Sequence, residues 1–216
     1  MPTNRDIKRS RYTGFADVGK IFANATRLEI VDALIQRPRS VENIASSIGQ
    51  SIASTSQHLQ VLKRVKAVET ERQGTTIVYS LTEGTLEVFI ALRNFAEQTN
   101  PSLILLQQQR SIKSINFEQV QHILRKRSAV LLDVRSELEF QNGHIKGAIN
   151  IPLQDLSERY AELVPSVDVI VTCRGPYCVS SDEAAAFLLT KDYSVVRYDD
   201  GIGEWSVRGG EVARLI

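Results

Sequence analysis

The chain has 216 residues, of which 43% are hydrophobic and 24% are charged, and its formal net charge is +1. This length allows one large domain or two small ones, and the composition is that of an ordinary globular protein. No apolar run approaches the roughly 20 residues of a membrane span, and the polar, basic start lacks the apolar core of a secretory signal. The two cysteines lie in one short stretch, which excludes a disulfide framework. We therefore expect a cytoplasmic protein with no membrane partner.

Helix-like patterns dominate the start of the chain. Residues 15–22 form a short amphipathic stretch after a polar, basic arm, and 25–35 place apolar side chains on one face. Ser40 is positioned to cap a short helix over 41–48, because a serine hydroxyl can accept a hydrogen bond from the unpaired N–H groups of a first helical turn.

A second helix and a β-hairpin follow directly. Gly49 supplies a turn, and the next helix begins after Ser51 or Ser54. Two helices joined by a tight glycine turn indicate a helix-turn-helix. Two β-rich runs then flank Gln73-Gly74, which predicts a hairpin. A hairpin that follows a helix-turn-helix makes a winged helix.

The helix expected over 83–98 has an apolar face that its own small domain can hardly cover. A homodimer interface is the expected outlet, with packing on a second domain as the alternative. Pro101 interrupts the helical pattern. We therefore divide the chain into a first domain over 1–100, a linker over 101–113 and a second domain over 114–216.

The second half alternates apolar strands with helix-like segments. The expected strands cover 129–134, 148–151, 167–172 and 195–198, and the expected helices cover 117–126, 136–142, 156–163 and 180–189. Near-continuous apolar strands between helices indicate a parallel sheet buried on both faces. The expected fold is thus an α+β winged helix-turn-helix domain followed by an α/β domain whose parallel sheet is flanked by helices.

Both cysteines lie in the loop between the strand over 167–172 and the helix over 180–189. Backbone N–H groups of such a loop and the positive end of the helix dipole are directed at Cys173, so we expect a lowered pKa and a reactive thiolate. Arg174 is expected to stabilise the anion, and Cys178 to resolve a modified Cys173. The other residues of this anion-binding loop are Gly175, Pro176, Tyr177 and Val179.

Inert packing is the alternative for both thiols, because free cysteine is among the most buried residue types. The Arg, Gly and Pro beside Cys173 make that interpretation less favourable there. For Cys178 it stays open whether the thiol resolves a persulfide or only packs at the helix start. A bond between the two sulfurs is also geometrically demanding at this separation.

The first half resembles the ArsR/SmtB family of dimeric bacterial repressors over about residues 15–95. The resemblance lies in Ser40–Ala45, in Ser54–Lys63 with its S-x-H-L-x-x-L pattern, and in the wing that ends at Val78–Leu81. It implies a homodimer whose partner is a double-stranded DNA operator. The recognition-helix residues are Ser54, Thr55, Ser56, Gln57 and His58, and the phosphate-binding cations are Lys63, Arg64 and Arg72. His58 could equally be a packed histidine.

Many ArsR/SmtB members sense metals, but this chain departs from their pattern. No Cys occurs before position 173, and residues 83–106 contain no His. We therefore expect no metal site, no cofactor and no soft-metal sensing by the winged helix. The signal must enter elsewhere.

The second half resembles the rhodanese family of sulfurtransferases over about residues 112–212. The resemblance lies in Asp133-Val134-Arg135, Glu139-Phe140, Gly143–Pro152 and a Gly/Trp element over 201–205. It implies a parallel-sheet fold, a Cys173 nucleophile in a six-residue cradle, a sulfane-sulfur donor and a thiol acceptor. Asp133 is expected to bond Arg135 or the backbone, with orientation of the nucleophile as the less favoured alternative, and His144-Ile145 to shape a turn.

One departure bears on the chemistry. Many rhodaneses carry Arg at the last loop position, where Cys178 stands here. Efficient thiosulfate chemistry is therefore in doubt, and enzymatic turnover stays an open question.

Three functions remain possible. The leading interpretation is a dimeric DNA-binding regulator, a repressor by resemblance, whose rhodanese domain senses or relays reactive sulfur through a Cys173 persulfide. The alternative is a sulfurtransferase whose winged helix serves mainly for localisation or dimerisation. A loop that binds an arsenic oxyanion is the least favoured, because As(III) sites mostly need three sulfur ligands.

Overall fold

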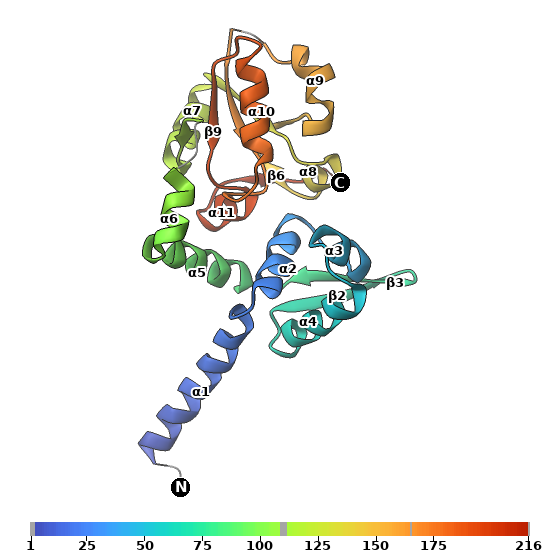
Figure 1. Cartoon of the computed structure of the whole chain (residues 1–216), viewed down its shortest axis with the longest axis vertical. Helices are drawn as coiled ribbons and strands as arrows, with labels where there is room; N and C mark the ends of the chain where they lie inside the picture. Colours follow the sequence, from blue (N-terminus) through green and yellow to red (C-terminus); the bar gives the residue numbers. More distant parts are fainter. Residues whose placement is uncertain (1–2, 109–111, 165, 216) are drawn as a thin grey trace. The chain divides into compact units, whose positions relative to one another are not determined.

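The computed structural model describes residues 3–108, 112–164 and 166–215. The chain folds as two compact units, Met1–Arg93 and Asn94–Ile216. Figure 1 labels the elements of both. This division falls within a helix, before the linker that we expected at 101–113. Among the described residues, no helix is long and apolar enough to cross a membrane.

The first unit is a winged helix-turn-helix, as expected. Its elements are α1 (Asn4–Phe22), α2 (Ala25–Gln36), β1 (Arg39–Ser40), α3 (Val41–Ser47), α4 (Ile52–Arg64), β2 (Val68–Gln73), β3 (Thr76–Leu81) and the start of α5 (Thr85–Thr99). The three strands form an antiparallel sheet in the order β1-β3-β2. Strands β2 and β3 pair along their whole length, and this hairpin is the wing.

Local side-chain chemistry fixes the two short helices. The Ser40 hydroxyl caps α3, and the Ser51 hydroxyl caps α4 by accepting the backbone N–H of Ser54 at 3.1 Å. Ser51, and not Ser54, is therefore the cap. Gly49 between the helices and Gly74 in the hairpin both have positive φ angles, of 64° and 62°. Glycine adopts this backbone conformation without a steric cost.

Helix α1 is longer than expected, since it begins at Asn4 and not near Phe15. The start signal is a capping box in which Thr3 and Asp6 bond each other's backbone N–H groups. At the other end, the Arg27 guanidinium donates to the last carbonyls of the helix. The core below these elements is apolar and includes Ile21, Ile30, Val31, Leu34, Ile44, Leu59, Leu62, Val68 and Phe89.

The second unit contains the expected parallel α/β sheet. Its elements after the end of α5 are α6 (Pro101–Gln108), β4 (Ser114–Ile115), α7 (Phe117–Lys126), β5 (Ala129–Asp133), α8 (Glu137–Asn142), β6 (His144–Ile145), β7 (Ile149–Asn150), η1 (Leu153–Asp155), α9 (Leu156–Arg159), η2 (Tyr160–Glu162), β8 (Asp168–Thr172), α10 (Ser180–Leu189), β9 (Val195–Tyr198), α11 (Ile202–Val207) and β10 (Val212–Ala213). Five strands run parallel in the order β4-β9-β8-β5-β7. Strands β6 and β10 form a separate antiparallel pair.

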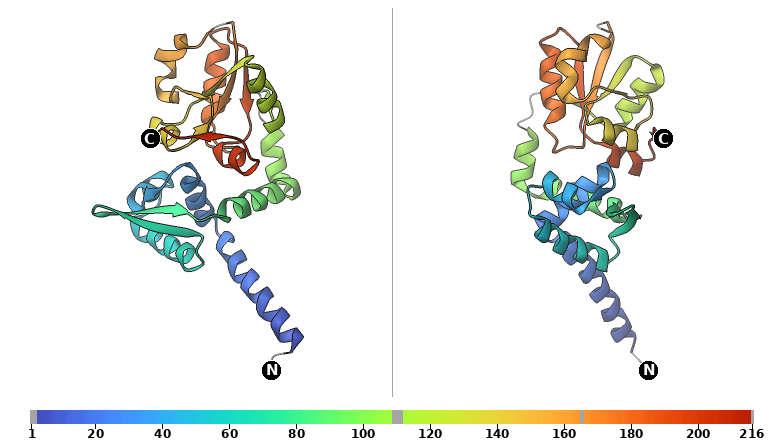
Figure 2. Two further views of the ribbon diagram at one scale, coloured as in Figure 1. Left: turned by 180° about the vertical axis from the view of Figure 1, so that it is seen from behind. Right: turned by 90° about the vertical axis from the view of Figure 1, so that its right-hand side faces the viewer.

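Apolar residues cover both faces of the five-stranded sheet, which accounts for the unbroken apolar runs of its central strands. Helices α9 and α10 cover one face, with a core that includes Leu132, Val171 and Leu188. Helices α7 and α11 cover the other face around Ile170 and Trp205. Figure 2 shows α10 and α7 on opposite sides of the strands. The carboxyl ends of β5 and β8, at Asp133 and Thr172, lie side by side.

The main departures from the expected elements are short ones. The helix expected over 156–163 is a single α-helical turn between two 3-10 turns. Strands β1, β4, β6 and β10 have two residues each and were not expected. Part of the expected linker forms helix α6, while residues 109–111 lie outside the described residues.

Candidate functional site

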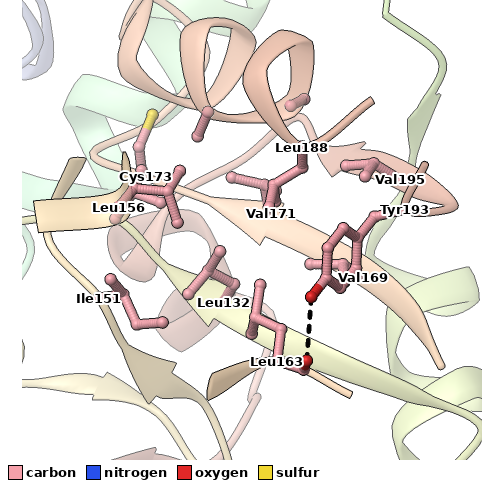
Figure 3. Close-up of a cluster of buried hydrophobic side chains, with 13 residues drawn as sticks. Leu132, Ile151, Leu156, Leu163, Val169, Val171, Cys173, Leu188, Tyr193 and Val195 are labelled. Atoms are coloured by element: carbon pink, nitrogen blue, oxygen red, sulfur yellow. Dashed lines mark hydrogen bonds between the residues drawn. The ribbon is translucent and has the colours of Figure 1, made fainter. Parts of the chain in front are cut away.

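The thiol loop begins where β8 leaves the sheet and ends where α10 begins. Figure 3 shows Cys173 beside Val171 and Leu156 at the edge of the apolar core. The Cys173 side chain is only 3% exposed. Val179 is the N-cap residue of α10, and it supplies no side-chain capping bond. The loop backbone and the Ser180 and Ser181 hydroxyls therefore serve the two sulfurs.

Cys173 has the surroundings of a protonated thiol. Its sulfur lies 3.4 Å from the Ser181 hydroxyl, 3.6 Å from the Cys178 carbonyl oxygen and 3.8 Å from the Gly175 carbonyl oxygen. The hydrogen bond that its thiol makes to Cys178, together with burial, raises the pKa of Cys173 well above that of a free thiol. The expected lowering of this pKa is therefore wrong: the helix dipole is outweighed by burial and by a neighbouring negative sulfur.

Cys178 is the acidic thiol of the pair. It is half-buried, and the hydrogen bond from Cys173 lowers the pKa of Cys178 to about 4, with further donors from Ser180 and the Arg174 backbone. The Arg174 Nη1 lies 4.0 Å from its sulfur. A thiolate on Cys178 is thus hydrogen-bonded and faces a cation.

A buried carboxylate holds Arg174 in place. Its Nε and Nη2 donate to the two carboxylate oxygens of Glu139 at 2.8 and 2.7 Å, and the Glu139 side chain is 2% exposed. Glu139 also accepts from the Ser136 backbone and hydroxyl at the start of α8. The ion pair raises the pKa of Arg174 above its usual value. The sequence placed Glu139 in a motif but carried no sign of this function.

The loop backbone is braced from below by the turn before α11. A Cβ on Gly201 would lie 2.4 Å from the Arg174 carbonyl oxygen, so only glycine fits there. The Gly201 N–H donates to the buried Glu204 carboxylate at 2.7 Å, and the same carboxylate lies beneath Gly175. The other loop side chains are more open: Pro176 is half-buried, while Tyr177 and Val179 are 55% and 63% exposed.

Asp133 and His144 are structural, as the sequence predicted. Asp133 forms a fully buried ion pair with Arg135 at 2.6 Å. The Arg135 guanidinium also donates to the Gly143 carbonyl at 2.8 Å. The His144 ring stacks on Phe140 at 3.8 Å and its Nδ1 is bonded to the Phe140 carbonyl at 2.8 Å. These contacts join β5, α8 and β6 beside the thiol loop.

Helix α4 exposes some of its candidate DNA-binding residues and buries one. Gln57 is exposed, while Ser54, Ser56 and His58 are half-buried. Thr55 is completely buried, and its hydroxyl donates to the Ser51 carbonyl at 2.9 Å. A DNA contact by Thr55 is therefore incompatible with this fold. The outward face also carries exposed Ala53 and Gln60, which helical spacing from Gln57 could have indicated.

The three predicted phosphate-binding cations are exposed. Lys63 and Arg64 lie at the end of α4, and Lys63 donates to the Thr70 hydroxyl at 2.9 Å. Arg72 lies in the wing and donates to the Gly74 carbonyl at 3.1 Å. No group of three or more His, Cys, Asp or Glu side chains within the described ranges is arranged to hold a metal ion.

The fold and these two sites define the class: a DNA-binding winged helix-turn-helix joined to a rhodanese-like domain. Comparison with known families agrees, since a Helix-turn-helix domain family matches residues 22–71 and the Rhodanese-like domain family matches residues 116–208. The chain is 35% identical over 213 residues to the HTH-type transcriptional regulator Rv0324 of Mycobacterium tuberculosis, across 97% of this chain and 94% of that protein. The chain belongs to this family of transcriptional regulators with an ArsR-like winged helix and a C-terminal rhodanese domain.

Partial relatives match the two halves separately. Thiosulfate sulfurtransferase GlpE of Stutzerimonas stutzeri is 35% identical over 80 residues, covering 37% of this chain and 72% of that protein. A solution structure of the homodimeric winged helix-turn-helix domain of Mb0332 from Mycobacterium bovis is 35% identical, with a TM-score of 0.41 over 45% of this chain and 89% of that one.

Proposed function

We propose that this regulator responds to reactive sulfur through a persulfide on Cys173, and that the modification changes its affinity for operator DNA. The observation that carries the proposal is the placement of the thiols. The DNA-binding unit contains no cysteine, while both cysteines of the chain lie in the rhodanese loop, hydrogen-bonded to each other. A signal read by sulfur chemistry can therefore enter only through that loop.

The chemistry needs no cofactor. The Cys173 thiolate attacks the outer sulfur of a sulfane donor R–S–S⁻, which gives Cys173–S–S⁻ and releases R–S⁻. The Cys178 thiol can then attack the inner sulfur, which gives a Cys173–Cys178 disulfide and releases HS⁻. Either product changes the charge and the hydrogen bonds of the loop at the start of α10. A thiol acceptor that removes the outer sulfur restores the starting state.

We further propose that the protein acts as a homodimer. Helix α1 exposes Tyr12, Phe15 and Val18, and α5 exposes Val88 and Leu92, with exposed fractions between 37% and 68%. These apolar residues recur at helical spacing, and apolar faces of this kind are usually covered by a partner. Two recognition helices in one dimer would read two half-sites of an operator.

The DNA-contacting surface that we propose is the outward face of α4 with the wing. Its base-reading residues are Gln57, Ser54, Ser56 and His58, with Gln60 added by the structure. The side-chain amide of glutamine pairs well with adenine in the major groove. Lys63, Arg64 and Arg72 would neutralise phosphates and make affinity fall steeply with salt.

A sulfurtransferase with a passive winged helix is the second candidate, supported by the rhodanese-like fold. The charges of the loop oppose efficient use of thiosulfate. Its one arginine, Arg174, is paired with Glu139, and Cys178 adds a negative charge beside it. A dianionic donor would meet no uncompensated cation there. Arsenic(III) binding is less favoured still, because the chain offers two cysteines and no third thiolate.

The test measures the affinity for the chain's own upstream DNA by fluorescence anisotropy at fixed salt. Reduced and polysulfide-treated protein are compared, with Cys173→Ala treated in parallel. We expect at least a tenfold change in Kd for the wild type, equivalent to about 1.4 kcal/mol of coupling, and none for Cys173→Ala. Full response in Cys173→Ala would refute the sensing proposal. Equal affinities of both wild-type forms, with catalytic sulfur transfer, would favour the second candidate.

A further inference from the structure

A buried, protonated Cys173 poses a problem for the proposed sulfur chemistry. Only the thiolate is an effective nucleophile, and this thiol is 3% exposed and faces two carbonyl oxygens and a hydroxyl. Such surroundings hold a proton on sulfur near neutral pH. Attack on a sulfane donor therefore requires a group that removes this proton within the site.

Cys178 is the group placed to take that proton. Its sulfur is hydrogen-bonded to the Cys173 thiol, and the surrounding donors favour its charged form. The Arg174 guanidinium lies 4.0 Å away, and Glu139 fixes its orientation through two hydrogen bonds. Because the guanidinium is held by a buried carboxylate, it stays beside Cys178 and keeps the negative charge there.

We propose that Cys178 is the general base of this site: a thiolate in the resting protein that takes the proton of Cys173 as the sulfane donor arrives. In the first step Cys173–SH and Cys178–S⁻ become Cys173–S⁻ and Cys178–SH. In the second step Cys173–S⁻ and R–S–S⁻ become Cys173–S–S⁻ and R–S⁻. Atoms, protons and charge balance at each step. This role deepens the proposed function, on which it rests.

The charged groups around the pair support one negative charge on the two sulfurs. Those contributed by the surrounding elements are Arg174 of the loop, Glu139 of α8, Asp182 of α10, and Glu204 of α11. Each carboxylate is already engaged, Glu139 by Arg174, Asp182 by Arg197, and Glu204 by the Gly201 N–H. Arg174 is thus the cation nearest the sulfurs in the described part of the loop, and it faces Cys178. A second thiolate would be repelled by the first, so the two thiols titrate as a coupled pair.

The resting charge can be located by thiolate absorbance near 240 nm in the full-length protein. The pKa of Cys178, about 4, predicts one thiolate per chain in the wild type from neutral pH down to about pH 5. Cys178→Ala and Cys178→Ser should lose this low-pH thiolate, because the remaining Cys173 is buried. Cys173→Ala should keep a thiolate, at a somewhat higher pKa. A thiolate that persists below pH 6 in both Cys178 variants would overturn the proposal.

The kinetic role is tested by persulfide formation with inorganic polysulfide, followed by peptide mass mapping. At pH 7 we expect the added sulfur on Cys173, formed about 100-fold faster in the wild type than in Cys178→Ala. Raising the pH towards 9.5 should narrow that gap, because hydroxide replaces the missing base; a purely structural role of Cys178 would leave the gap constant. Cys178→Ser, a smaller change in shape, guards against misfolding of the alanine variant.

Two results would overturn the assignment of the base. Equal rates for wild type and Cys178→Ser at pH 7 would show that Cys173 needs no base, and sulfur added to Cys178 in the wild type would show that the nucleophile is reversed. Neither result depends on DNA. A change in DNA affinity upon sulfuration, measured separately, decides the proposed function, so failure of one proposal is distinguishable from failure of the other.

Discussion

Replacing Asp133 with alanine should destabilise the second unit by about 3–5 kcal/mol, because the Arg135 guanidinium is left buried without its counterion. The side chains of this pair are 2% and 1% exposed and approach to 2.6 Å. Asp133 also accepts the backbone N–H of Arg135 at 3.0 Å, so the variant loses a second bond. The Gly143 carbonyl remains as a partner of the guanidinium, but it carries no compensating charge.

Removing both charges should cost much less than removing one. The double variant Asp133→Ala/Arg135→Met replaces the buried pair by apolar groups, and such replacements are often close to neutral. We therefore expect the double variant to recover most of the stability that Asp133→Ala loses. The difference between the double variant and the sum of the single ones measures the coupling of the pair.

The single tryptophan of the chain provides the assay. Trp205 is 4% exposed and packs against Phe117 and Tyr198, so its fluorescence in urea follows the second unit alone. With a slope of about 2 kcal/mol per molar urea, a loss of 4 kcal/mol lowers the midpoint by about 2 M. The control is Lys146→Ala, which breaks an ion pair with two exposed partners and should leave the midpoint almost unchanged. Equal shifts in the two variants would refute the reasoning.

Three further predictions concern the DNA face and the loop. Gln57→Ala should weaken operator binding by about 1–3 kcal/mol in anisotropy titrations, while Thr55→Val, at a buried position, should leave affinity nearly unchanged; the reverse order would contradict the orientation of α4. Arg64→Gln should reduce the slope of log K against log salt by about 0.9 for each phosphate that Arg64 neutralises, and an unchanged slope would remove Arg64 from the interface. Gly201→Ala should abolish polysulfide labelling of Cys173, because the new Cβ collides with the loop backbone, whereas Gly14→Ala meets no neighbouring atom and should label normally; normal labelling of both would contradict the bracing role.

Long elements with a clear apolar pattern were predictable to the residue. The helices over 117–126 and 180–189 and the strand over 195–198 have the predicted bounds. Two-residue strands such as His144–Ile145 were not predictable, because a pair of residues has no periodicity and becomes a strand only through its partner. The early start of α1 did have a signal, the Thr3–Asp6 capping box, which the basic side chains around it obscured.

The candidate sites show the same division at the level of single residues. A polar residue on the core side of a helix looks like a DNA contact in sequence, and only the position of Leu59 and Leu62 on the same face reveals that Thr55 is buried. Sequence also placed Cys173 at a strand end, but acidity depends on which neighbours reach the sulfur. Carbonyl oxygens meet Cys173, whereas Cys178 receives a thiol hydrogen bond and a guanidinium set by a carboxylate 35 positions earlier in the chain. The order of acidity in a dithiol is thus a tertiary property, and it decides which sulfur stores the charge and which one attacks.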